Sequence, residues 1–144
     1  MDFYIVNLNK VDGKGTNPIK GLFPAGSHFG AVKDIAISTE KNIAVSIGAD
    51  RFARIWSYGE KWIGIHAHKF PDMPLSVDIH PQGFQLLVGF KEFMRVYYIT
   101  QDDFKLALEQ VCKNCNCVKY SHSGEFFVAS FGPDANLYST YSLK

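Results

Sequence analysis

The sequence lacks a strong imbalance of charge, and it lacks any long apolar run. Its 15 lysines and arginines are matched by 14 aspartates and glutamates, so the formal net charge at pH 7 is +1. Because nucleic acids and anionic membranes are recognised through basic surfaces, this balance predicts neither kind of partner. No apolar run approaches the roughly 20 residues of a membrane-spanning helix, so we also expect no membrane insertion.

Cysteine is scarce, and the three that occur are crowded together as Cys112, Cys115 and Cys117. An odd number argues against a secreted disulfide framework and favours a reducing compartment. The N-terminal sequence MDFYIVNLNK also lacks the basic and apolar regions of a secretory signal peptide. We therefore expect a cytoplasmic protein.

The CxxC and CxC spacings within CKNCNC at 112–117 are also found in metal sites. A structural zinc ion needs four ligands, and the nearest candidate for a fourth is His122. In the competing interpretation, Cys117 is buried at the apolar start of a strand, as free cysteines often are. We predict no metal and no other cofactor, and we keep zinc binding by the cysteine cluster as an alternative.

Two histidines, His66 and His68, alternate within WIGIHAHK and so share one face of a predicted strand. Together with His28 and His80 they could form a metal site on paper. We favour an exposed outer strand for the first pair and a turn, HPQG, for His80. Neither a nucleophile elbow nor a phosphate-binding loop occurs, so we predict that the protein is not an enzyme.

Helical periodicity is also missing. The nearest window, FKLALEQV at 104–111, would make a short and uncapped helix, and we interpret it as a strand. Short alternating stretches between turn signals predict an all-β fold instead. These stretches repeat, because Ile35, Val77 and Val118 open similar segments 42 and 41 residues apart. Each segment leads through a turn and a second stretch to a third stretch that ends on an aromatic residue: Trp56, Tyr97 and Tyr141.

Four short strands in each 40–45 residues is the period of a β-propeller blade. We predict about three four-stranded antiparallel blades, with a fourth stretch in two of them, at 62–69 and 104–111. Three blades cannot close a ring, so their open faces should pack against other protein chains or the rest of a larger propeller. The predicted divisions are a partial outer strand of a preceding blade plus a loop over 1–27, a blade over 28–72, a degenerate blade over 73–112, and a third blade without its outer strand over 113–144.

The nonapeptide GADRFARIW at 48–56 resembles the third-strand signature of WD-repeat β-propeller blades. In that family the Asp accepts a hydrogen bond from a His at the start of the blade, which in turn bonds a strand hydroxyl that meets the Trp. The resemblance implies a structural rather than catalytic network, and its members here would be His28, Ser46, Asp50 and Trp56.

A second resemblance is more specific. The stretches HPQGFQLLVGF at 80–90, RVYYITQDD at 95–103 and YSHSGEFFVA at 120–129 are similar to the cilia- and flagella-associated WD-repeat proteins of the motile axoneme. The likeness covers about residues 28–141. It implies a non-enzymatic scaffold in the axoneme of the cilium or flagellum, which docks dynein-regulatory or doublet-microtubule-associated assemblies and has axonemal subunits as partners.

Two alternatives remain open, namely a general cytosolic WD-repeat adaptor of a ubiquitin-ligase or trafficking complex, and a zinc-binding protein that uses the cysteine cluster. Three basic residues are candidate contacts for an acidic partner, although such side chains are commonly only solvated: Arg51, Lys61 and Lys69.

Overall fold

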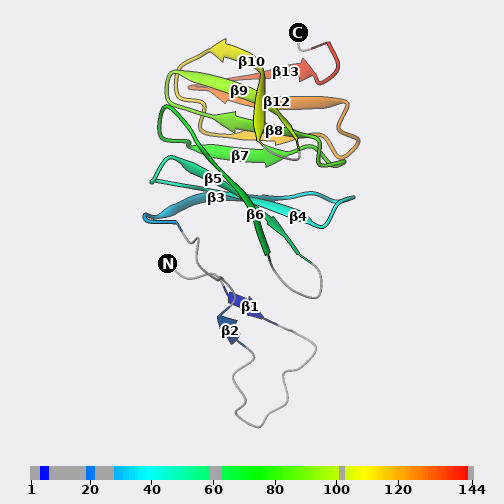
Figure 1. The fold of residues 1–144 in the computed structure, drawn as a ribbon. Helices are drawn as coiled ribbons and strands as arrows, with labels where there is room; N and C mark the ends of the chain where they lie inside the picture. The colour runs from blue at the N-terminus through cyan, green and yellow to red at the C-terminus, as the bar shows by residue number, and fades with distance from the viewer. Residues whose placement is uncertain (1–3, 7–18, 22–27, 59–62, 101–102, 143–144) are drawn as a thin grey trace.

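The computed structural model describes residues 4–6, 19–21, 28–58, 63–100 and 103–142. Every regular element in this part of the chain is a β-strand, as Figure 1 shows. Within the same residues there is no helix long and apolar enough to cross a membrane. The all-β prediction is confirmed.

Three antiparallel sheets, which we call the first, second and third blades, follow one another along the chain. The first blade has the strand order β3-β4-β5-β6, with bounds Val32–Ile37, Ile43–Gly48, Phe52–Ser57 and Ile63–Lys69. The second has the order β10-β9-β8-β7, and its strands in chain order are Ser76–Ile79, Gln85–Gly89, Phe93–Ile99 and Phe104–Val111. The third has the order β11-β12-β13, with bounds Val118–Tyr120, Phe126–Phe131 and Asp134–Ser139.

The predicted number of blades and the missing outer strand of the third blade are thus confirmed, and the sheets do not close into a barrel (Figure 1). Within 1–27 the sequence predicted one strand and a loop. The described residues there form two short strands, β1 (Tyr4–Val6) and β2 (Ile19–Gly21), which pair with each other.

The blades stack face to face, and the second blade lies between the other two (Figure 1). Strand β8 explains how one sheet can serve two neighbours, because successive side chains of a strand point to opposite faces. Leu86 and Val88 belong to the core shared with the first blade, whereas Leu87 belongs to the core shared with the third. A strand buried on both faces reads as a continuous apolar run, which accounts for QLLVGF at 85–90.

One detail of the predicted repeat is wrong. Trp56 faces Ala44 and Tyr97 faces Leu86 across neighbouring strands, and the equivalent pair in the third blade is Tyr138 with Phe127. Tyr138, rather than Tyr141, is therefore the third member of the aromatic series. The turn from β12 to β13 is only Gly132–Pro133, so this unit is shorter than the spacing of aromatic residues suggested.

Candidate functional site

A chain of side-chain hydrogen bonds crosses the first blade. His28 Nδ1 lies 2.9 Å from Asp50 Oδ1, His28 Nε2 lies 2.8 Å from Ser46 Oγ, and Trp56 Nε1 donates to Ser46 Oγ at 2.9 Å. A carboxylate only accepts and an indole only donates, so the direction of the chain follows. His28 carries its proton on Nδ1, and the Ser46 hydroxyl donates to Nε2. The structure thus brings together the four residues that the resemblance singled out.

The Asp50 carboxylate at the end of this chain is 7 % exposed and is surrounded by donors. It accepts from the amides of Phe29 and Phe52, and it pairs with Arg54 Nη1 at 2.9 Å. Burial raises the pKa of Asp50, but the hydrogen bonds from His28 and the two amides outweigh it and leave the pKa below its usual 3.8. The carboxylate is therefore charged at neutral pH and holds the turn after β4 in place.

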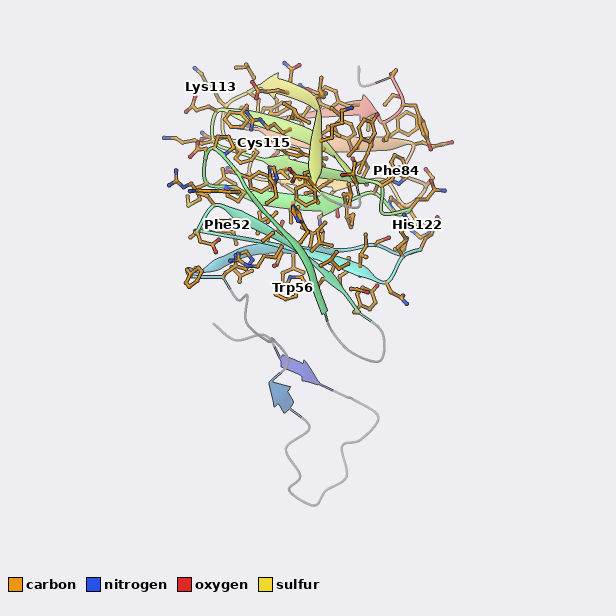
Figure 2. All side chains as sticks on the ribbon, viewed as in Figure 1. Phe52, Trp56, Phe84, Lys113, Cys115 and His122 are labelled. Carbon is orange, nitrogen blue, oxygen red and sulfur yellow. The ribbon has the colours of Figure 1, made fainter. Side chains whose placement is uncertain are left out.

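Local geometry explains why these side chains meet. Ser46 on β4 pairs with Arg54 on β5, and Trp56 lies two residues further along the same face. Figure 2 shows Trp56 on the side of the first blade turned away from the second blade. Gly48 completes the arrangement, since a Cβ there would overlap both His28 and Asp50. The sequence interpretation did not single out Gly48, although it begins the signature stretch.

The second blade has a different polar arrangement at the position of Trp56. The Tyr97 hydroxyl accepts from Arg95 at 3.2 Å, and Arg95 forms an ion pair with Glu109 at 2.6 Å. Burial raises the pKa of Tyr97, so the phenol stays protonated at neutral pH.

Hydrogen bonds also join neighbouring blades, and none of these was predicted. Asp34 Oδ2 accepts from Val77 N–H at 2.9 Å, and Asp78 Oδ2 accepts from Tyr120 N–H at 2.7 Å. The bonds repeat about 43 residues apart, because each innermost strand presents a carboxylate to the innermost strand of the next blade. An aspartate within each predicted apolar strand, 34 and 78, was the available signal.

The turn histidine His80 forms a second contact of this kind between the second and third blades. It is fully buried, its Nε2–H donates to the Gly124 carbonyl at 3.1 Å, and its Nδ1 accepts from the Gln82 amide at 3.1 Å. Burial lowers the pKa of His80 below its usual 6.5, although Gly124 and Glu40 oppose this, so the ring is neutral at pH 7.

The predicted partner contacts fall partly within the described residues. Arg51 and Lys69 are exposed and line an open hollow of about 550 Å³, which also includes Arg95 and Leu106. Lys61 lies outside the described residues.

The three cysteines differ in their surroundings. Cys112 is half-buried, Cys115 is buried and Cys117 is exposed, so Cys117 is not the buried strand residue that one interpretation required. Burial raises the pKa of the Cys115 thiol to about 12, and it also raises the pKa of Cys112. Zinc binds thiolates, so these protonated thiols are poor ligands. In the part of the chain that the structure describes, His122 does not join them in a group of potential ligands.

The histidines considered as metal ligands separate into three places. His28 lies in the network of the first blade and His80 lies between the second and third blades. His66 and His68 remain together on β6, and the residue that joins them is Asp103 from the second blade. The sequence interpretation missed Asp103, because nothing in the sequence places it beside β6.

These features define the chain as an open stack of β-propeller-type blades. No protein-family model matches the sequence. Similar curated proteins are cilia- and flagella-associated protein 57 A of Tetrahymena thermophila, 27 % identical over 69 % of this chain, and cilia- and flagella-associated protein 57 of Mus musculus, 24 % identical over 85 %. A third, protein 57 C of Tetrahymena thermophila, is 28 % identical over 76 % of this chain. The chain spans only 8–10 % of the length of these relatives.

Proposed function

We propose that this chain is a propeller segment of a ciliary WD-repeat protein and acts as a non-enzymatic scaffold in the axoneme. It docks dynein-regulatory or doublet-microtubule-associated assemblies through its surfaces. The observation that carries the proposal is the open-ended stack, because apolar side chains remain on both outer blades. Ile37 on β3 is 56 % exposed and Leu137 on β13 is 66 % exposed. Contiguous exposed apolar surface marks an interaction site.

The names of the relatives support the cellular setting. All three similar proteins are called cilia- and flagella-associated, and the matches extend over most of this chain. The hydrogen-bonded chain from Trp56 to Asp50 supports the WD-repeat assignment, since those residue types occupy the positions that the resemblance requires.

The basic hollow supports a contact with an acidic protein surface. Arg51 and Lys69 lie on its rim, while Leu106 adds apolar area. Charges at the rim of an interface mainly raise the association rate and the specificity. Substitution of Arg51 and Lys69 should therefore slow docking rather than abolish it.

The test is the location of the tagged chain in ciliated cells. We expect it to enter cilia and to stay with the axoneme after detergent removes the membrane and soluble matrix. A Leu137→Glu variant should be released by the same treatment, whereas Val111→Glu, at the end of β10, should be retained. A chain that stays in the cell body and co-purifies with soluble complexes would contradict the proposal and favour the cytosolic adaptor.

A further inference from the structure

Three potential metal ligands meet where the outer strands of the first and second blades approach each other. His66 and His68 are two residues apart on β6 and so point to the same side. Asp103 lies just before β10, and its Oδ1 atom is 3.1 Å from His66 Nε2 and 2.8 Å from His68 Nδ1. One ligand atom from each residue lies within 4.8 Å of the other two.

We propose that His66, His68 and Asp103 bind a divalent transition-metal ion, with zinc the best match, and that this ion links β6 to β10. Zinc binds imidazole nitrogen and carboxylate oxygen at about 2.0–2.2 Å, so tetrahedral ligand atoms lie about 3.3–3.6 Å apart. The observed separations are slightly shorter, and small side-chain movements would admit the ion. A neutral imidazole can carry its proton on the other ring nitrogen, so no net deprotonation is required.

The surroundings hold the three side chains in place. The His68 ring packs against Phe70, Tyr97 and Phe104, with centroid distances of 5.4, 5.6 and 5.1 Å. The His66 ring meets the edge of Phe104 at 5.9 Å. Rings fixed by packing lose little further freedom when a metal binds, which favours affinity.

Asp103 is fixed by its own turn. Its carboxylate accepts from the Phe104 amide at 2.7 Å, and its backbone amide donates to Thr100 Oγ1 at 3.2 Å. The Phe104 amide, followed by His68, holds the pKa of Asp103 at about 2, so the carboxylate is charged throughout the neutral range. The site is also accessible, since the His66 and His68 side chains are 28 % and 21 % exposed.

A bound ion at β6 has two competing alternatives. In the first, the two histidines donate hydrogen bonds to Asp103 and no ion is involved. In the second, the cysteines at 112–117 bind an added metal at a site unrelated to β6. The ligand substitutions and the spectrum of a bound cobalt ion distinguish these cases, because thiolate ligands add an intense near-ultraviolet charge-transfer band that imidazole and carboxylate lack.

The experiment titrates the 144-residue chain with Zn²⁺ and Co²⁺ and compares it with His66→Ala and Asp103→Asn. His122→Ala is the matched control, because His122 is an exposed histidine in the third blade. We expect one equivalent of metal to bind the unmodified chain and the control, and each ligand substitution to weaken binding by at least about ten-fold. Zn²⁺ at one hundred times its dissociation constant should raise the ratio of folded to unfolded chain about one hundred-fold, but not in the ligand variants.

Circular dichroism without metal checks that each variant is folded, and either ligand variant alone suffices for the comparison. The proposal is overturned by a lack of stoichiometric binding, by equal affinity in the control and both ligand variants, or by a thiolate band in the cobalt spectrum.

Discussion

At the scale of single residues, the buried polar groups of the first blade depend on one another. The Ser46 hydroxyl accepts from Trp56 and donates to His28, which donates to Asp50. Each group is satisfied only while its neighbour is present, and an unsatisfied buried group costs about 1–3 kcal/mol.

Ser46→Ala and Trp56→Phe should therefore each destabilise the fold, by about 1–2 kcal/mol. The double variant should lose less than the sum, because both substitutions remove the same hydrogen bond. Urea unfolding of the four proteins measures this coupling, and Lys33→Ala on the exposed side of β3 is the control. Strictly additive losses would contradict a connected network.

The pH dependence of stability should reflect His80. Burial holds its pKa below 6.5 in the folded state, so the unfolded chain binds more protons as the pH falls below 6.5. The contribution of neutral His80 is thus complete above pH 6.5 and is lost as the pH falls through the folded pKa. His80→Gln keeps a donor for Gly124 and should flatten this part of the curve, as thermal unfolding between pH 5 and about 7.5 would measure. An unchanged slope in the variant would exclude His80 as the source.

At the scale of elements, the turn glycines show how one blade fits the next. Gly83 and Gly124 occupy equivalent turns and have φ angles of +68° and +75°, a left-handed conformation that glycine adopts readily. A Cβ at Gly83 would approach Ile43 and Lys41 of the first blade, and a Cβ at Gly124 would overlap His80 of the second. Each turn thus touches the preceding blade without a side chain between them.

Gly132 offers a matched comparison for Gly124, because its φ is +60° and a Cβ there would meet nothing within 4 Å. Gly132→Ala should cost only the backbone strain, about 1–2 kcal/mol. Gly124→Ala adds an overlap with His80 and should destabilise the third blade considerably more. Chemical denaturation gives both values, and similar losses would mean that the contact with His80 contributes little.

Patterns within a single strand could be predicted from the sequence, and contacts between strands could not. Alternation and turn residues identified the four-stranded units, and a resemblance placed His28, Ser46, Asp50 and Trp56 in one network. The sequence interpretation placed Tyr141 where Tyr138 lies, because it assumed a constant turn length. It also missed the contacts of Asp34, Asp78 and Asp103, because each acceptor meets a donor more than 30 residues away that only the stacking brings near.

At the scale of the whole molecule, the stack ends in surfaces that resemble its own interior. Val128 on β12 and Leu137 on β13 pair directly on the outer face of the third blade, with 40 % and 66 % exposure. The inner face of the same sheet, which includes Phe127 and Ala129, is buried against the second blade.

The isolated chain should therefore self-associate, and Leu137→Glu should reduce this association. Val111→Glu controls for added charge, because Val111 is 78 % exposed at the end of β10 rather than on the outer face. Sedimentation velocity over a range of concentrations measures the difference. A monomeric unmodified chain at high concentration would contradict an adhesive outer face.

The bonds from Asp34 to Val77 and from Asp78 to Tyr120 connect only adjacent sheets, so cohesion passes from neighbour to neighbour along a line. Such an arrangement opens from its extremities inward. Amide hydrogen exchange should then be slowest in β8, which is covered from both sides, and fastest in β13, so that protection declines stepwise with distance from the centre of the pile.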